Sequence, residues 1–418
     1  MALRKAGSNW VDGDRFFDRE TELEALGERV EDGTHTLLTA QRRMGKTSLV
    51  RELLRRLDEQ GTFETVFVDL EAAGGPEDAV AEIAARSESV SGAWQAIKSG
   101  FASTLRGVIQ HIDEVGVSEA RVKFRAGVDS GNWQHKGDLV LQALAASRKP
   151  VVLAIDELPI LVSRLLKGGD GTITLERTRL AEEFLGWLRK NGQAHQGQIC
   201  LILSGSVGLQ PILHQVGLTA QANIYSPFDL RPWNEPTATE CLAELAETYE
   251  LALSPEIRAD MCRRLRCLVP HHVQQFFDHL HEHQRRHGRH SATLDDVAHV
   301  YEQELLGVRG QTDLDHYESR LKMALDQQGY RAALELLTEA ATNAGQLRAD
   351  AIALYNDDYG DAVLIRNVLH LLEHDGYLER SDDGYRFVSA LLEDWWRARH
   401  GQYFAPIAER EPSKGTSR

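Results

Sequence analysis

Cysteine is scarce in this chain, with four residues among 418. No two of them form a CxxC pair, and the nearest two are five positions apart in a segment with a helical pattern. This spacing gives neither a zinc-ligand signature nor a disulfide framework. We therefore expect reduced thiols in or beside the core, as in a cytoplasmic protein. The four residues are Cys200, Cys241, Cys262 and Cys267.

Long apolar runs and an excess of positive charge are also missing. No stretch approaches the roughly 18 apolar residues of a membrane span, and the N-terminal MALRKAGSNW lacks the apolar core of a signal peptide. A net charge of -16 gives no overall attraction to nucleic acid, so any DNA contact needs a local basic patch. We expect a soluble, cytoplasmic protein, and 418 residues predict two or three domains.

The most informative motif is AQRRMGKT, which directly follows the apolar run Thr36–Thr39. It matches the pattern GxxxxGK[ST] of a phosphate-binding loop between a strand and a helix, except that Ala40 replaces the first glycine. In such a loop, successive backbone N–H groups and the N-terminus of the helix hold the phosphates. The predicted nucleotide-binding residues are Ala40, Gln41, Arg42, Arg43, Met44, Gly45, Lys46, Thr47 and Ser48.

Single residues of this motif have distinct roles. Lys46 supplies a positive charge to the β and γ phosphates, and the Thr47 hydroxyl ligates Mg²⁺. Gly45 allows the backbone to approach the phosphates closely. For Arg42 and Arg43, a solvated side chain is an equal alternative to a phosphate contact, because the loop binds through its backbone.

A second motif, VVLAIDE at residues 151–157, is an apolar strand that ends in two carboxylates. Asp156 at the tip of the strand can hold Mg²⁺ through water, and Glu157 can polarise an attacking water. Solvated acids at the end of a core strand are the alternative interpretation. The phosphate-binding loop upstream favours the nucleotide site.

Apolar runs and helical patterns alternate through the first half of the chain, which predicts a parallel, doubly wound α/β sheet. A whole strand-helix unit is inserted between the Lys46 loop and Asp156, and Glu157 directly follows Asp156. This order indicates the branch of P-loop proteins that activates water with a glutamate. The segment 117–128 alternates weakly and predicts a hairpin or an edge strand. Strands are expected at 36–39, 64–70, 151–157, 199–204 and 225–230, and helices at 46–58, 76–112, 138–147 and 175–191. Within residues 12–26, an aromatic pair precedes a further, acidic helix that leads into the first strand.

Beyond Pro232 the pattern becomes helical, with helices expected at 235–249, 254–268 and 271–287. Histidine is dense from 271 to 299. His279 and His283 are four positions apart, but no acidic partner stands out, so solvated helix faces are favoured over a metal site.

Residues 330–399 carry the pattern of another unit. A helix, a turn at 345–347, two more helices and two alternating stretches follow the plan of a winged helix-turn-helix. Trp395 and Trp396 are expected in its core, and the polar tail after Ala405 predicts disorder. The predicted domains are a P-loop ATPase core (1–231), a helical lid (232–320), a winged helix domain (321–405) and a disordered tail (406–418).

These motifs resemble the prokaryotic AAA-type ATPases, sometimes called archaeal-type, which are related to STAND signalling NTPases and origin-recognition ATPases. The pieces that carry the resemblance are FFDRETELEAL, LTAQRRMGKTSL, VVLAIDELPIL, LILSGSVGLQPIL, LRPW and RFVSALLEDWWRARH. The resemblance implies nucleotide binding by the first domain and lid-like behaviour by the second. It also implies that Ser204 senses the γ-phosphate, with local backbone bonding as the alternative.

Other positions of the resemblance are less specific. Asp18 stands where the family usually has a glycine, and Pro270 matches a turn of STAND lids. Candidates for an arginine finger are Arg177, Arg179 and Arg231, for each of which a structural ion pair or a surface position is the favoured interpretation.

Three functions fit the sequence: a nucleotide-switched regulatory ATPase, a DNA-handling ATPase and a scaffold without hydrolysis. The presence of Lys46, Thr47, Asp156 and Glu157 argues against the scaffold. The third helix and the wing of the C-terminal domain carry acidic residues where a DNA-reading domain would carry basic residues, which favours a protein partner.

We therefore predict an ATP- and Mg²⁺-dependent regulatory ATPase, with DNA handling as the alternative and oligomerisation possible. Its predicted catalytic residues are Glu157, Lys46 and Ser204, and its predicted metal ligands are Thr47 and Asp156.

Overall fold

The computed structural model describes residues 3–6, 10–101 and 117–410. The chain divides into two compact units. The helical unit comprises Met1–Asp18, Ala40–Gly45 and Arg231–Arg418, and the sheet unit comprises Arg19–Thr39 and Lys46–Leu230. Among the described residues, no helix combines the length and the apolar character needed to cross a membrane.

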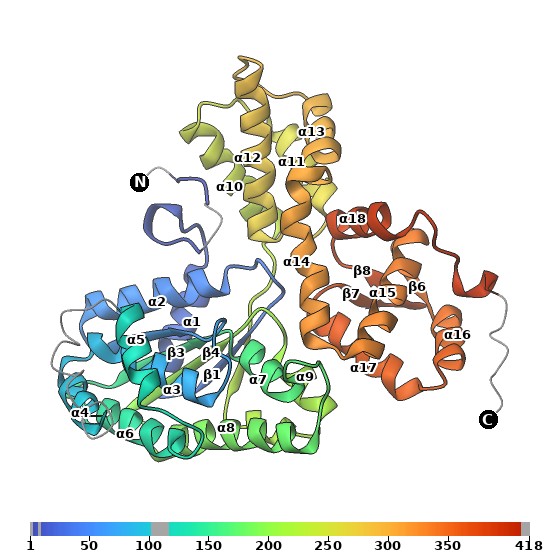
Figure 1. Cartoon of the computed structure of the whole chain (residues 1–418). Helices are drawn as coiled ribbons and strands as arrows, with labels where there is room; N and C mark the ends of the chain where they lie inside the picture. Colours follow the sequence, from blue (N-terminus) through green and yellow to red (C-terminus); the bar gives the residue numbers. More distant parts are fainter. Residues whose placement is uncertain (1–2, 7–9, 102–116, 411–418) are drawn as a thin grey trace. The chain divides into compact units, whose positions relative to one another are not determined.

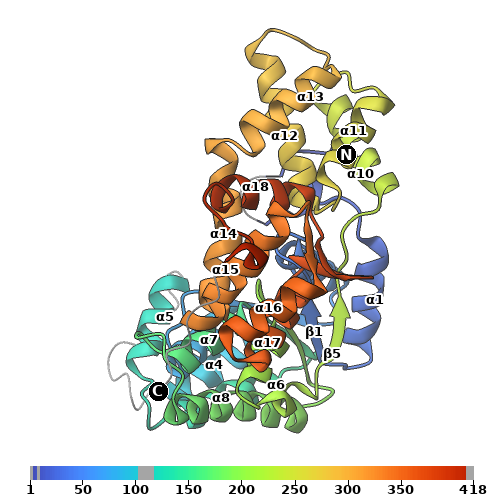
Figure 2. The ribbon, with the colours of Figure 1, turned by 90° about the vertical axis from the view of Figure 1, so that its right-hand side faces the viewer.

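A parallel sheet forms the core of the sheet unit, as predicted. Its strands are β1 (Thr36–Thr39), β2 (Glu64–Asp69), β3 (Val151–Asp156), β4 (Ile199–Ser204) and β5 (Ser226–Asp229). They lie in the order β2-β3-β4-β1-β5, and every neighbouring pair is parallel. Every residue of β3 and β4 is buried, as expected for central strands with helices on both faces. Figure 2 shows β5 at the edge, beside β1.

Helices cover both faces of this sheet. Helices α2 (Lys46–Gln60) and α8 (Leu175–Ala194) lie on opposite sides of it in Figure 1. The predicted stretch 76–112 is divided by a 3₁₀ turn at Ser87–Ser89, and its residues 102–112 lie outside the described part. The other helices of this unit are α1 (Glu20–Glu31), α3 (Pro76–Arg86), α4 (Ser91–Phe101), α5 (Val117–Ala126), α6 (Trp133–Ala145), α7 (Leu158–Lys167) and α9 (Leu209–Gln215).

The prediction of a hairpin or edge strand at 117–128 is wrong, because α5 occupies this segment. Ala120 and Phe124 are one helical turn apart, and both are fully buried. The Phe124 ring packs against Phe101 and Trp94, with ring centroids 4.9 and 5.7 Å away. Burial therefore follows the helical period rather than the weak alternation of the sequence.

The first part of the helical unit is a group of helices, which confirms the three predicted there. Side-chain oxygens of Asn234, Ser254 and Thr293 accept backbone N–H bonds and cap three of these helices. All four cysteines of the chain are buried and unpaired, as predicted, and burial raises the pKa of each thiol. The elements are α10 (Glu235–Thr248), α11 (Pro255–Leu265), α12 (Pro270–Arg286), α13 (Leu294–Val300), a π-helical turn (Tyr301–Leu305) and α14 (Val308–Ala324).

The expectation of a solvated histidine face without an acidic partner is wrong. In the π-helical turn, Glu304 is buried, and its carboxylate lies 3.4 Å from His279 Nδ1 and 3.5 Å from His283 Nδ1. Arg286 donates to the same carboxylate over 2.6 Å and supplies the counter-charge. Glu304 is distant in sequence, so helix spacing could not indicate it. Among the described residues, no group has the arrangement of a metal site.

Helix α12 also buries a histidine that makes stability depend on pH. His272 is 1 % exposed, and burial lowers its pKa to about 3, with His271 and Arg43 acting in the same direction. Because the pKa of His272 is lower in the folded than in the unfolded protein, protonation favours unfolding. The folded state is therefore most stable above about pH 6.5, and it loses stability as the pH falls below this value. When the pH is lowered from 7 to 5, His272 should reduce the free energy of unfolding by about 2 kcal/mol.

We therefore expect His272→Gln to flatten the pH dependence of the thermal unfolding midpoint between pH 7 and pH 5. His135→Gln is the matched control, because His135 is exposed on α6 in the sheet unit. Calorimetric scans at both pH values measure the effect. An equal drop in the midpoint for wild type and His272→Gln would show that another group carries the pH dependence.

The last part of the helical unit combines helices with a three-stranded antiparallel sheet in the order β6-β8-β7. The predicted turn at 345–347 is wrong for Gln346 and Leu347, because both belong to β6 and pair with β8. Trp395 and Trp396 are buried, as predicted. The elements are α15 (Gln327–Thr342), β6 (Gln346–Arg348), α16 (Ala349–Tyr359), α17 (Ala362–His374), β7 (Leu378–Ser381), β8 (Gly384–Phe387) and α18 (Ala390–His400).

The start of the predicted disordered tail is ordered. Ile407 lies in a 3₁₀ turn, is buried, and donates its N–H to Glu339 over 2.9 Å. Arg410 pairs with Glu335 at 2.8 Å. Because these two contacts hold the segment, polarity alone gave a wrong prediction for residues 406–410. Residues 411–418 lie outside the described part.

Candidate functional site

The predicted phosphate-binding loop lies between β1 and α2. Thr39 ends β1, and Lys46 begins α2 and is 7 % exposed. Gly45 has φ +88°, which a glycine adopts without strain. Arg43 also takes a left-handed conformation, with φ +66°, and such a conformation is uncommon for a residue with a side chain. The loop is therefore a tight turn into a helix N-terminus, the arrangement that suits an anion.

The predicted metal ligands lie together at the ends of α2 and β3. The Thr47 hydroxyl donates to Asp156 Oδ2 over 2.6 Å, and Asp156 is 4 % exposed. The other oxygen, Oδ1, accepts from the Ser204 hydroxyl at 2.6 Å and from the Glu157 backbone N–H at 3.0 Å. A hydroxyl and a carboxylate side by side, both oxygen ligands, suit Mg²⁺. Local donors thus fix the carboxylate that would hold the ion.

Glu157 directly follows Asp156 and has a left-handed backbone conformation, with φ +57°. Its Oε2 accepts two hydrogen bonds from Ser206, one from the backbone N–H and one from the hydroxyl, both at 2.9 Å. The two carboxylates therefore have separate partners and can take separate roles. Ser206 is a site residue that sequence reasoning missed, although the Ser204-Gly205-Ser206 tripeptide was the available signal.

Ser204 lies at the end of β4 and is 2 % exposed. Its hydroxyl orients Asp156, so side-chain bonding to a carboxylate replaces the local backbone bonding considered as an alternative. Its role as a γ-phosphate sensor stays a prediction.

Among the arginine-finger candidates, Arg177 has a structural role in the sheet unit. It donates to the backbone carbonyls of Lys167 and Thr172, at 2.9 and 2.6 Å, and pairs with Asp170. This agrees with the favoured interpretation of a structural ion pair.

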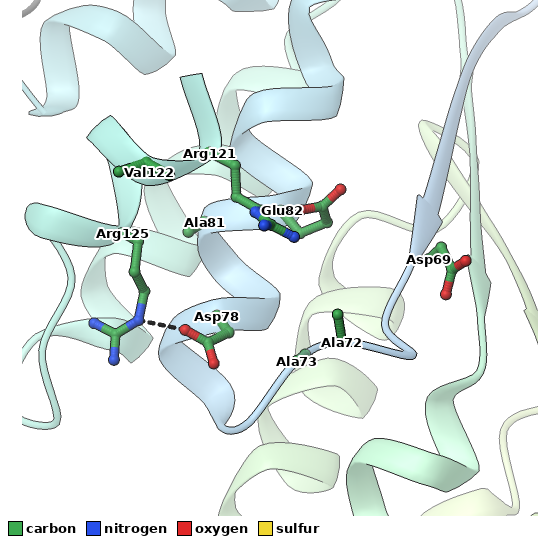
Figure 3. Close-up of a pocket in the computed structure, with 9 residues that line it drawn as sticks. All are labelled: Asp69, Ala72, Ala73, Asp78, Ala81, Glu82, Arg121, Val122 and Arg125. Atoms are coloured by element: carbon green, nitrogen blue, oxygen red, sulfur yellow. Dashed lines mark hydrogen bonds and ion pairs between the residues drawn. The ribbon is translucent and has the colours of Figure 1, made fainter. Parts of the chain in front are cut away.

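A cavity of about 280 Å³ lies beside the end of β2 (Figure 3). Asp69 lines it, and in the strand register this residue is the neighbour of Asp156. Burial and the charge of Asp156 raise the pKa of Asp69. The basic groups of the cavity are already neutralised, because Arg125 pairs with Asp78, and Arg121 Nε lies 3.6 Å from the Glu82 carboxylate. Both arginines that line the cavity in the described part of the chain are therefore engaged by carboxylates rather than free for a phosphate.

In the helical unit, the two loop arginines have different surroundings. Arg43 pairs with Asp313 on α14, and Asp313 Oδ2 also accepts from Gln275 on α12 at 2.7 Å. Arg42 has two buried nitrogens, Nε and Nη1, without a hydrogen-bond partner. Burial, together with the charges of Arg320 and Arg43, lowers its pKa to about 10. The alternative of solvated side chains is wrong for both arginines.

The sheet order, the loop before α2 and the carboxylates at the end of β3 define an α/β P-loop nucleoside triphosphatase fold. Residues 29–213 match the family described as AAA domain. This part of the chain is therefore similar to an AAA domain, in agreement with the resemblance found in the motifs.

The chain is also similar to solved structures. A Walker-type ATPase of Pyrococcus abyssi matches with a TM-score of 0.58 and 17 % identity, over 93 % of this chain and 98 % of that chain. At this identity the match shows the fold alone. The ORC2 protein of Aeropyrum pernix, solved as ADPNP-ADP complexes, matches with a TM-score of 0.46 and 14 % identity, over 94 % and 97 % of the two chains. No curated protein sequence matches the chain.

Proposed function

We propose that this protein is a Mg²⁺-dependent ATPase that works as a regulatory switch. The observation that carries the proposal is the group formed by Thr47, Asp156 and Ser204 at the end of β3, with Glu157 held separately by Ser206. Nucleotide binding is what an AAA-type ATPase domain and a phosphate-binding loop are expected to provide. Phosphate release from ATP by the purified chain, with Mg²⁺ and with a chelator, tests the proposal.

In the proposed reaction, the loop backbone and the Lys46 ammonium bind the β and γ phosphates. Thr47 and Asp156 would hold Mg²⁺, which supplies charge neutralisation when bound. Glu157 takes a proton from the attacking water, and Ser206 sets the position of its carboxylate until water arrives. Ser204 keeps Asp156 oriented and contacts the γ-phosphate. Each role belongs to a different side chain, so each can be removed separately.

The proposed switch uses the helical unit. Residues 232–320 act as a lid, and residues 321–405 act as a winged helix domain. The order α15-β6-α16-α17-β7-β8 supports the second assignment, because it is the helix and strand order of that plan. We propose that nucleotide state reaches a partner through these parts, and that the protein acts in the cytoplasm.

The proposed partner is a protein rather than duplex DNA. In the wing, Arg380 pairs with Glu373 at 3.0 Å, and Arg386 pairs with Glu379 at 2.7 Å. The turn between β7 and β8 carries Asp382 and Asp383. A phosphate backbone would meet neutralised arginines and two acids, so counterion release has little to contribute.

We expect the full chain to show no salt-sensitive binding of random duplex DNA at physiological ionic strength. Fluorescence anisotropy of a labelled duplex, measured at two salt concentrations, tests this. Micromolar binding that weakens with salt would favour the DNA-handling alternative. Arg366→Glu, on the exposed face of α17, would then have to abolish that binding.

A further inference from the structure

The ion pair between Arg43 and Asp313 connects the phosphate-binding loop to the rest of the helical unit. Arg43 contributes Nη2 to the pair, while its Nε is buried and has no hydrogen-bond partner. A guanidinium binds an anion best through two parallel N–H bonds. Arg43 is therefore bound by a carboxylate in less than its best geometry, and one of its donors remains available.

Asp313 is a permanent anion at this position. The neighbouring His271 imidazole, together with Arg43, lowers the pKa of Asp313 to about 2. Gln275 donates a hydrogen bond to the second carboxylate oxygen of Asp313 over 2.7 Å. The Asp313 side chain is 32 % exposed. A negative charge is thus held in place beside a loop whose predicted ligand is a polyanion.

The loop also carries a second arginine with buried donors that are not hydrogen-bonded. Arg42 lies near Arg43 and Arg320, and two of its buried nitrogens lack hydrogen-bond partners. Close like charges in a partly buried setting raise the free energy of the loop, and an added anion lowers it. A phosphate group would supply the missing acceptors for both loop arginines.

We propose that Asp313 is a built-in competitor of the nucleotide phosphates, because it occupies Arg43 until phosphate binds and displaces it. This inference rests on the proposed function, since it needs nucleotide at the loop. A carboxylate and a phosphate offer the same kind of oxygen acceptor to a guanidinium, so one can replace the other. Exchange frees Asp313, and with it the contact that joins the loop to α12 and α14.

The left-handed backbone conformation of Arg43 is also linked to its ion pair with Asp313. A residue with a side chain at φ +66° persists only when its surroundings hold it there, and the Asp313 pair is such a constraint. Linkage makes the effect reciprocal, because a contact that opposes nucleotide binding must itself be weakened by nucleotide. The contact can therefore report the occupancy of the loop to the helical unit.

The test measures the affinity of the full chain for ADP and for a non-hydrolysable ATP analogue, both with Mg²⁺. Asp313→Asn should bind the analogue about three- to tenfold more tightly than wild type, because the competing charge is gone. Asp313→Ser removes the same charge with a smaller side chain and should behave alike if the first variant folds poorly. Asp315→Asn is the matched control, since Asp315 lies on the same helix but pairs with Arg399 at 2.7 Å.

A double-mutant cycle tests whether Asp313 acts on nucleotide binding through Arg43. Arg43→Ala should weaken binding of the analogue, and adding Asp313→Asn to it should give no further gain. Affinity of Asp313→Asn equal to or weaker than wild type, or a gain that persists without Arg43, would overturn the inference. These outcomes differ from a failure of the proposed function, in which wild type itself binds neither nucleotide.

Discussion

Replacing Glu157 by Gln is expected to lower ATP turnover by about 10²- to 10⁴-fold, the usual contribution of a general base. Affinity for ATP should stay within about twofold, because the amide oxygen can still accept both hydrogen bonds from Ser206. The variant should therefore bind ATP and hold it. Phosphate release at saturating ATP and a nucleotide-binding titration, made on the same preparation, separate the two effects.

The control for this variant is Glu183→Gln on the exposed face of α8, which should hydrolyse ATP like wild type. Unchanged turnover in Glu157→Gln would assign the base to another carboxylate. Asp69 would be the next to test, because it is the register neighbour of Asp156 on β2.

The second large effect is expected from Lys46→Ala. Lys46 begins α2, and its predicted role is direct contact with the β and γ phosphates. Loss of a hydrogen-bonded charge contact costs about 1.5–3 kcal/mol, which corresponds to roughly 10- to 100-fold weaker ATP binding. At subsaturating ATP, the turnover of Lys46→Ala should fall by at least the same factor as its ATP affinity.

Lys149→Ala is the matched control, since Lys149 is exposed in the sheet unit just before β3. It should leave affinity and turnover unchanged. A similar loss in both variants would point to general electrostatic attraction rather than a specific contact at the loop.

Local patterns were sufficient to predict the sheet and the proximity of Thr47 and Asp156. Strand β4 was predicted with its observed bounds, and β3 to within one residue, because central parallel strands are uninterrupted apolar runs. Thr47 and Asp156 were placed together from motifs alone, and their side chains are 2.6 Å apart. Such motifs are informative because phosphate and Mg²⁺ require particular groups at particular spacings.

The features that were missed depend on contacts between distant parts of the sequence. The pairing of Arg43 with Asp313 and of His283 with Glu304 has no local signal, because spacing within one helix cannot reveal a partner on another. Strand β6 has only three residues and is defined by its hydrogen bonds to β8. Helix α5 was misassigned because its alternation was weak, whereas Ala120 and Phe124, which are fully buried, follow the helical period.

The most direct test of the account is a calorimetric titration of wild type and Lys46→Ala with a non-hydrolysable ATP analogue, with Mg²⁺ and with a chelator. The account predicts one bound analogue per wild-type chain, weaker binding when Mg²⁺ is removed, and roughly 10- to 100-fold weaker binding by Lys46→Ala. Equal affinity of the two proteins, or no binding by folded wild type, would contradict it.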